Sequence, residues 1–239
     1  MKKIKLLHPL ISCICITDNR PLMLVKAIIR FDVQNYPNRE LVISYPENDQ
    51  GTRNLIAKII ELSGMSILPI ERPIGQSVGK AKNDAIANCN GEYICVWDDD
   101  DWSDDDRLST QYNTIHAQYS YPEASVLSRI ILYDATKNKA YHSFNYHWGC
   151  SLLCNREILL KHPYTDRDIE NDIRLIQYLQ NKNLVSYIEN RPPTLIHVYH
   201  GTNVIDYHQF LYLTKRSESM ENSTSDWIHG LLNLQVQLL

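Results

Sequence analysis

The first hundred residues alternate short runs of β-forming apolar residues with longer amphipathic stretches, and this alternation constrains the fold most strongly. The apolar runs suit strands that are buried on both faces, while the amphipathic stretches carry an apolar stripe at helical spacing. Such a pattern predicts βαβ units, a mostly parallel sheet and ligands at the carboxyl ends of the strands. The expected strands are 10–16, 40–44, 67–68 and 93–97, and the expected helices are 22–33, 52–62 and 78–89.

Composition limits the class of protein. The chain has 239 residues and is 44% hydrophobic, which is enough apolar material for one large or two small domains. Its formal net charge is -4, so a polyanion-binding surface over most of the protein is excluded, and we expect no nucleic-acid partner.

Cysteine usage and the N-terminus bear on the cell compartment. The six cysteines are not a disulfide framework in a chain of this length, and they lack the paired spacings of a zinc site, so we expect buried, reduced thiols. The basic and apolar residues 1–7 imitate a signal peptide, but His8 and Pro9 break the pattern, and we interpret the segment as a lead-in to the first strand. No run approaches the ~20 apolar residues of a membrane-spanning helix. A cytoplasmic protein is expected.

Four consecutive aspartates, residues 98–101, directly follow the apolar strand that ends at Trp97. Adjacent carboxylates repel one another unless a cation compensates them, and carboxylates are the ligands that hard divalent metals prefer. A divalent cation is therefore expected here, in preference to a solvated acidic loop. The later aspartates, residues 104–106, are expected only to favour the N-terminus of the helix that follows them.

Three segments in the first half together resemble family 2 glycosyltransferases with the GT-A fold. Residues 9–20 resemble the family's opening strand, and residues 75–85 resemble the loop and helix before its metal-binding strand. Residues 91–102 are similar to its Gly-Glu-Tyr, hydrophobic strand and Asp-x-Asp-Asp signature. Looser likenesses at 148–157, 168–173 and 200–203 extend the resemblance to about residue 205.

The resemblance implies an organisation of the chain. Residues 1–205 would form a GT-A domain of the α/β class, with a mostly parallel central sheet flanked by helices. Its nucleotide-sugar half would be 1–105 and its acceptor half 106–205. Residues 206–239 fall outside the resemblance, and their apolar residues predict a C-terminal helical extension. We expect this extension to pack into the core, in preference to forming a dimer contact or a contact at the inner face of a membrane.

The same resemblance implies a metal site for Mn2+ or Mg2+ at the aspartate run. Asp100 would bind the metal directly, and Asp98 would face the ribose or reach the metal through water. Asp99 occupies the variable position of the motif. We expect its side chain to be simply exposed to solvent, in preference to a contact with the nucleotide-sugar donor. His200 would be a third metal ligand or a contact of the diphosphate.

A nucleotide-sugar donor is implied, with uridine diphosphate preferred and guanosine and thymidine left open. Relatives often place aspartates after the second strand to meet uracil, whereas Tyr45 would stack on the base here and Glu47 or Asp49 would accept its N–H. Lys82 stands where many relatives have arginine, facing phosphate or ribose. The donor-binding candidates are Thr17, Arg20, Tyr45, Glu47, Asp49, Lys82, Asp98 and Asp99.

An inverting transfer needs a base that takes the proton of the acceptor hydroxyl. The resemblance points to residues 168–172, but Asn171 occupies the position of the usual aspartate, and an amide cannot take a proton. Asp172 is therefore preferred to Glu170, and the alternative for both is a charge that complements a helix N-terminus.

The resemblance as a whole implies a metal-dependent inverting glycosyltransferase that acts on a glycan or lipid-linked acceptor in the assembly of a bacterial-type surface polysaccharide. Two alternatives stay open. Asn171 is compatible with a non-catalytic module that binds a sugar nucleotide or a partner. A nucleotidyltransferase shares the architecture, but residues 17–21 contain no glycine for a phosphate-binding loop.

Overall fold

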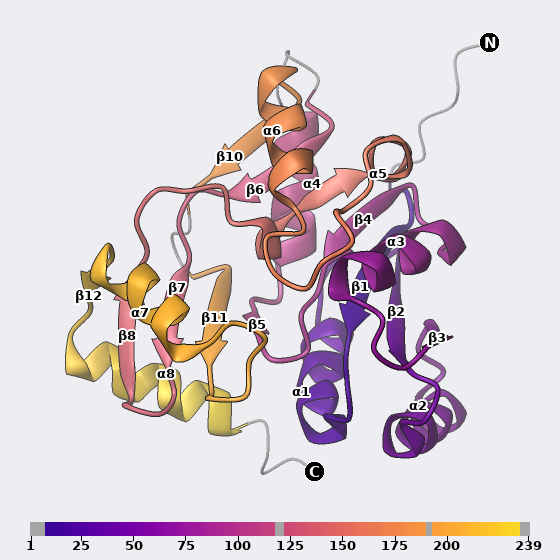
Figure 1. Ribbon diagram of the computed structural model, residues 1–239, viewed down its shortest axis with the longest axis horizontal. Helices are drawn as coiled ribbons and strands as arrows, with labels where there is room; N and C mark the ends of the chain where they lie inside the picture. The colour runs from indigo at the N-terminus through magenta and orange to yellow at the C-terminus, as the bar shows by residue number, and fades with distance from the viewer. Residues whose placement is uncertain (1–7, 118–121, 190–192, 235–239) are drawn as a thin grey trace.

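The computed structural model describes residues 8–117, 122–189 and 193–234, which form two β-sheets with helices packed around them (Figure 1). Residues 1–7, with the predicted lead-in, and residues 235–239 of the predicted extension lie outside this range. The helices are α1 (Pro21–Asp32), α2 (Gln50–Ser63), α3 (Val78–Asn88), α4 (Arg107–His116), α5 (Arg156–Lys161), α6 (Ile173–Asn181), α7 (Tyr207–Lys215) and α8 (Asn222–Leu234), with a 3-10 turn at Gly149–Ser151.

The larger sheet has seven strands in the order β10-β6-β9-β4-β1-β2-β3. Parallel pairing joins β4, β1, β2 and β3, whereas β9 runs antiparallel between β4 and β6. This mostly parallel α/β arrangement confirms the expected fold class. The strands are β10 (Val185–Ile188), β6 (Ala124–Leu127), β9 (Leu153–Asn155), β4 (Tyr93–Val96), β1 (Ile11–Ile16), β2 (Arg39–Pro46) and β3 (Ile67–Arg72).

Strand alternation sends successive side chains of the larger sheet into two separate cores. In β1, Cys13 and Cys15 face the core that includes α1, α2 and α4, while Ile14 faces the core that includes α3, α5 and α6. Helices therefore cover both faces, which explains why the strands read as continuous apolar runs. All six cysteines are free thiols, and five of them are buried.

The smaller sheet has five strands in the order β12-β8-β7-β11-β5. Helix α8 packs on this sheet through Ile228, which is fully buried beside Tyr133 and Val198. The expectation that the C-terminal stretch packs into the core is thus confirmed for this helix, although Trp227 remains 53% exposed. The strands are β12 (Glu218–Ser219), β8 (Lys139–His142), β7 (Ile131–Asp134), β11 (Leu195–Tyr199) and β5 (Trp102–Ser103).

The aspartate run connects the two sheets. It leaves the interior strand β4 at its carboxyl end and leads directly into β5, which pairs antiparallel with β11. The prediction that residues 98–101 directly follow an apolar strand is confirmed, and this strand lies in the interior of the sheet, between β9 and β1. None of the helices in the described ranges is long and apolar enough to cross a membrane.

Arg107, the first residue of α4, ties this junction together from a fully buried position. Its guanidinium donates to the backbone carbonyls of Val96 and Cys150 at 2.8 and 3.2 Å and to Ser103 Oγ at 2.8 Å. It therefore satisfies polar groups at the end of β4, in β5 and in the 3-10 turn, all of which lie where water is excluded.

We predict that Arg107→Met lowers the free energy of unfolding by about 2–4 kcal/mol, because several buried acceptors lose their partner at once. Urea denaturation followed by circular dichroism measures the change. Arg174→Met, at an exposed position of α6, is the matched control and should change stability by less than about 0.5 kcal/mol. Equal losses in the two variants would contradict this account of Arg107.

Candidate active site

Asp99 is the most deeply buried carboxylate of the run, with 2% of its surface exposed. Its Oδ2 accepts a hydrogen bond from Thr17 Oγ1 at 2.6 Å, and its Oδ1 pairs with Arg20 Nη2 at 2.7 Å. Burial raises the pKa of Asp99 to about 7, and the neighbouring charge of Asp100 acts in the same direction. The preference for simple exposure of Asp99 is corrected, because Thr17 and Arg20 turn its side chain inward.

One oxygen of the Asp100 carboxylate lies within hydrogen-bond distance of three donor groups. Arg20 Nη1, His200 Nε2 and Asn203 Nδ2 lie 3.1, 3.2 and 3.3 Å from Asp100 Oδ2. Burial acts to raise the pKa of Asp100, but the hydrogen bond from His200 and the charges of His197 and Arg20 outweigh it, so the pKa is lowered. Asp100 is thus held as a carboxylate.

Asp101 forms a buried pair with His197 of β11. The two oxygens of Asp101 lie 2.9 and 3.1 Å from His197 Nδ1, and Oδ1 also accepts from the backbone N–H of Val198 at 3.1 Å. Burial acts to lower the pKa of His197, but the charge and hydrogen bond of Asp101 raise it to about 9. The His197 ring is therefore a fixed cation at neutral pH.

Asp98 and Lys82 face each other across the same region. Burial raises the pKa of Asp98 to about 6, opposed by the charge of Lys82 and reinforced by the charges of Asp101 and Asp100. The Lys82 ammonium also lies 5.0 Å from the centre of the Tyr164 ring, which holds the side chain against α3.

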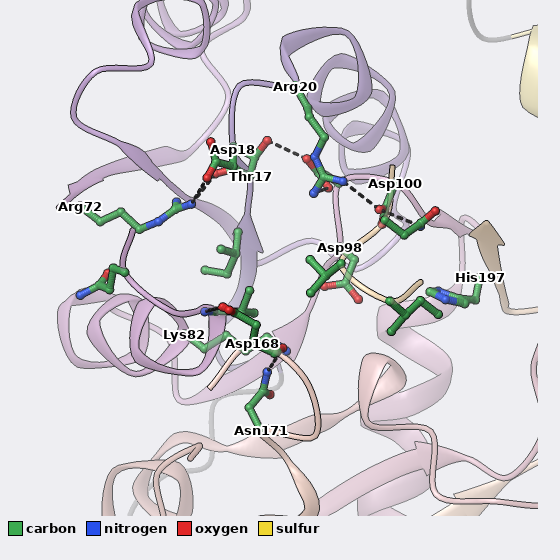
Figure 2. Close-up of a pocket in the computed structure, with 17 residues that line it drawn as sticks. Thr17, Asp18, Arg20, Arg72, Lys82, Asp98, Asp100, Asp168, Asn171 and His197 are labelled. Carbon is green, nitrogen blue, oxygen red and sulfur yellow. Dashed lines mark hydrogen bonds and ion pairs between the residues drawn. The ribbon is translucent and has the colours of Figure 1, made fainter. Parts of the chain in front are cut away.

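These groups surround a cleft of about 360 Å³ at the carboxyl ends of β1 and β4, shown in Figure 2. Six of the residues expected to bind donor or metal line it, namely Thr17, Arg20, Lys82, Asp98, Asp99 and Asp100. The sequence did not single out Asp18, Arg72, Gln76, Asp168, His197 or Asn203, which also line it. His200 does not line this cleft; it contacts Asp100 Oδ2 at 3.2 Å and, with Asp100, lines a neighbouring cavity of about 310 Å³.

The residues after β2 are placed differently from the expectation. Tyr45 is 3% exposed, lies in the core beside Leu41 and Ile43, and so has no face on which a base could stack. Glu47 is exposed outside the cleft. Asp49 is buried and caps α2, accepting the backbone N–H of Thr52 at 2.9 Å.

The two candidate bases share the cavity next to α7, but only Asp172 also lines a cleft beside His197. Glu170 is exposed, with a left-handed φ of 55°, and it borders a cavity next to α7. Asp172 precedes α6 and lines a second cleft of about 420 Å³, together with Trp148 and Gly149. Asn171 is buried and lines the first cleft, where its side chain donates to the backbone carbonyl of Asp168 at 3.0 Å.

Asp172 lies close to the aspartate run despite belonging to another element. Burial raises the pKa of the Cys150 thiol, the charges of Asp101, Asp98 and Asp172 raise it further, and the charge of Arg107 opposes them, so all three carboxylates act on the same thiol. His197 lines both clefts and therefore stands where they meet. Gly149 permits the approach of Asp172, because a Cβ at this position would overlap its carboxylate.

The side chains at Asp100 fit a divalent cation whose coordination sphere is completed by a bound substrate. No group of three or more His, Cys, Asp or Glu side chains in the described residues is arranged to hold a metal. Asp100 Oδ2 and His200 Nε2 nevertheless lie 3.2 Å apart, and both would be ligand atoms once Nε2 gives up the proton that it donates to Asp100. The remaining coordination positions would be left to oxygens of the bound substrate.

Comparison with known proteins bears directly on this arrangement. The sequence model of glycosyl transferase family 2 matches residues 12–172, well over half of the chain. The chain belongs to this family. The match includes β1, the aspartate run and Asp172, and it confirms the family expected from the sequence. No curated protein matches the chain.

Solved structures of low sequence identity show the same GT-A fold. One is the mannosyltransferase PcManGT from Pyrobaculum calidifontis in complex with GDP-Man and Mn2+, with a TM-score of 0.62 and 17% identity over 85% of this chain and 60% of that one. Another is the 1–349 fragment of S. aureus TarS in complex with UDP, with a TM-score of 0.64 and 13% identity over 90% of this chain and 68% of the fragment. A third is the same fragment in complex with UDP-GlcNAc, with a TM-score of 0.65 and 12% identity over 90% and 69%. This chain therefore spans about three fifths of the Pyrobaculum protein.

We predict that Arg20→Leu lowers the free energy of unfolding by about 1–3 kcal/mol, because Asp99 and Asp100 lose a shared, partly buried cation. Urea denaturation at pH 8 measures it. The matched control is Arg53→Leu, whose pair with Glu71 is exposed to solvent and whose loss should lower stability much less than the loss of Arg20. Unchanged stability of Arg20→Leu would show that the aspartates do not need this cation to fold.

Proposed function

We propose that this chain is a metal-dependent inverting glycosyltransferase that moves a sugar from a nucleoside diphosphate donor, with a UDP-sugar preferred, to an acceptor hydroxyl. The observation that carries the proposal is the meeting of two clefts at His197. The first contains the carboxylates and cations suited to a diphosphate, and the second contains Asp172. A donor sugar at the meeting point would have its leaving group on one side and the acceptor on the other.

The donor side is built for the departure of a diphosphate. A Mn2+ or Mg2+ held by Asp100 and His200 would neutralise the negative charge that develops on the leaving oxygens. Lys82 from α3 and Arg20 before α1 bring two further cations to the wall of the cleft. Asp98 is in position to accept a hydrogen bond from a ribose hydroxyl. Arg20 and Asp100 are held in place by their mutual ion pair, and His200 is held by its contact with Asp100.

The acceptor side offers a base on the opposite wall. Inversion by a single displacement requires a group that removes the proton of the attacking hydroxyl from the far side of the sugar. Asp172 fits this role better than Glu170, because it lines the second cleft beside His197 while Glu170 faces outward. Asn171 occupies the first cleft and would contact the donor without accepting a proton.

The walls of the second cleft favour an acceptor that carries sugar rings. Tyr146 is 45% exposed and stacks on His147, with ring centres 5.5 Å from Trp148 and 5.3 Å from His147. The apolar C–H faces of a sugar pack on such rings, while Gln177 and Gln180 supply hydrogen-bond partners for its hydroxyls. We propose a glycan or lipid-linked glycan as acceptor, consistent with assembly of a surface polysaccharide.

Asp100→Asn tests the donor site. With one carboxylate ligand gone, Mn2+-dependent binding of UDP should weaken by about tenfold or more in calorimetry. Asp105→Asn is the matched control, since Asp105 pairs with Arg30 at the surface, and it should bind UDP as the unaltered chain does. Equal affinity of Asp100→Asn and the unaltered chain would overturn the metal assignment.

Asp172→Asn tests the base. It should leave donor affinity nearly intact and cut kcat by ~10²–10⁴ at saturating acceptor, because only proton removal is lost. Gly149→Ala should also lower kcat without weakening the donor, since the added methyl group displaces the Asp172 carboxylate. Glu170→Gln is the control and should keep its turnover. Loss of kcat in Glu170→Gln alone would transfer the role to Glu170.

Hydrolysis of the donor distinguishes this proposal from the alternative of a non-catalytic binding module. A working centre hydrolyses its nucleotide-sugar slowly in the absence of acceptor, and that reaction needs the metal site. Release of UDP from UDP-GlcNAc, UDP-Glc and UDP-Gal with Mn2+, abolished in Asp100→Asn, would support the enzyme. UDP binding without hydrolysis of these donors would favour a binding module.

A further inference from the structure

Among the described residues, His197 and Ile205 line both the first and the second cleft. Under the proposed function, on which this inference rests, the diphosphate occupies the first cleft and the acceptor hydroxyl meets Asp172 in the second. The transferred sugar is bonded to the diphosphate and is attacked from the acceptor side, so it must lie where the two clefts meet. His197 and Ile205 are therefore the side chains that this sugar meets there.

The His197 ring is held in one orientation by its neighbours. Its Nδ1 lies 2.9 and 3.1 Å from the two oxygens of Asp101, and that carboxylate also accepts the backbone N–H of Val198 at 3.1 Å. Figure 2 shows the ring pointing from β11 into the first cleft, on the side of Asp100 and opposite Lys82. Because Asp101 occupies Nδ1, the ring nitrogen left for a ligand is Nε2.

Nε2 of His197 is accessible to a ligand. None of the described residues forms a hydrogen bond with it, and it is not among their buried polar atoms that lack a partner. The side chain is 18% exposed, so Nε2 reaches the wall of a cleft. A hydroxyl group can accept a hydrogen bond from a protonated Nε2 or donate one to a bare Nε2. A sugar hydroxyl therefore suits this nitrogen in either form of the ring, whereas an ionised phosphate oxygen can only accept.

The groups suited to the diphosphate are separate from this pair. Lys82 and Arg20 line the first cleft but not the second. Ile205 has an apolar side chain, which would remove water from a diphosphate without replacing its hydrogen bonds. The C–H face of a sugar ring has no such cost, and the hydroxyl groups lie around the edge of that ring. A polar nitrogen beside an apolar side chain thus matches a sugar better than it matches a phosphate.

We infer that His197 and Ile205 bind the transferred sugar, with His197 Nε2 hydrogen-bonded to one of its hydroxyl groups and Ile205 against its C–H face. The pair makes the enzyme select its donor by the sugar as well as by the nucleotide. A donor in which the contacted hydroxyl is missing or inverted leaves Nε2 without a partner, and an unpaired polar group is the strongest basis for such selection.

Calorimetric titration of the full chain in the presence of Mn2+ tests this assignment. The probes are UDP, UDP-Glc, UDP-Gal, UDP-GlcNAc, GDP and GDP-Man, and the tightest-binding nucleotide-sugar is compared with its own nucleoside diphosphate. His197→Asn places an amide nitrogen where Nδ1 was, so it can keep the hydrogen bond to Asp101 while Nε2 is removed. The affinity of the nucleotide-sugar relative to that of the nucleoside diphosphate should fall by about tenfold. Any effect on the diphosphate alone cancels in this ratio.

Two further variants complete the test. His162→Asn is the matched control, because His162 stacks on Tyr178 outside both clefts, and it should leave the ratio unchanged. Ile205→Ala removes apolar atoms only and should lower the ratio by about threefold. Thermal unfolding verifies that each variant is folded. If His197→Asn does not fold, the ratio measured for Ile205→Ala decides the test in its place.

The outcomes separate this inference from the function on which it rests. A ratio that falls in His197→Asn and is kept in His162→Asn supports the assignment. Equal weakening of the nucleotide-sugar and the nucleoside diphosphate, or an unchanged ratio, overturns the sugar contact while the donor site stands. Binding of a nucleoside diphosphate without binding of any nucleotide-sugar overturns it as well. If none of the probes binds, the proposed donor site falls and the inference falls with it.

Discussion

The compensation of buried negative charge at the end of β4 is the constraint on which the rest of the site depends. Asp99, Asp100 and Asp101 are placed close together and largely out of water, and each is matched by a cation or donor from a distant part of the chain. Arg20 comes from the start of α1, and His197 comes from β11. Satisfying the carboxylates thus fixes how the two sheets meet, and the cleft between them follows.

Much of the fold could be predicted from the sequence because its signals are local. Apolar runs followed by helical stripes define β1 to β4, and the sequence places the aspartate run at the end of an interior strand without any knowledge of contacts. The same alternation also indicates on which face of β2 Tyr45 lies. Leu41, Ile43 and Tyr45 share one face of β2, so the period of two alone predicts that Tyr45 points into the core. Its expected role came from the resemblance, which aligns positions and does not assign faces.

The unpredicted parts of the site depend on pairings between distant residues. Asp101 and His197 are separated by 96 positions, and Arg20 and Asp100 by 80. A histidine within the apolar run of β11 was visible in the sequence, but its carboxylate partner was not. Arg72 had a clearer signal, since a charged residue at the carboxyl end of a strand in a parallel sheet lies where ligands bind. Local patterns therefore identify which residues can act, and only the tertiary contacts show which of them act together.

The placement of His197 also explains why the second sheet is part of the site. The carboxyl ends of β1 and β4 can form only the floor and one wall of the first cleft, because they end on the same edge of one sheet. The opposite wall must come from elsewhere, and β11 supplies it by pairing with β5 directly after the aspartate run. His197 projects from that strand into both clefts and is held there by Asp101. Without β11 the first cleft would retain Asp98 and Asp100 but would lack His197, the side chain that links it to the cleft containing Asp172.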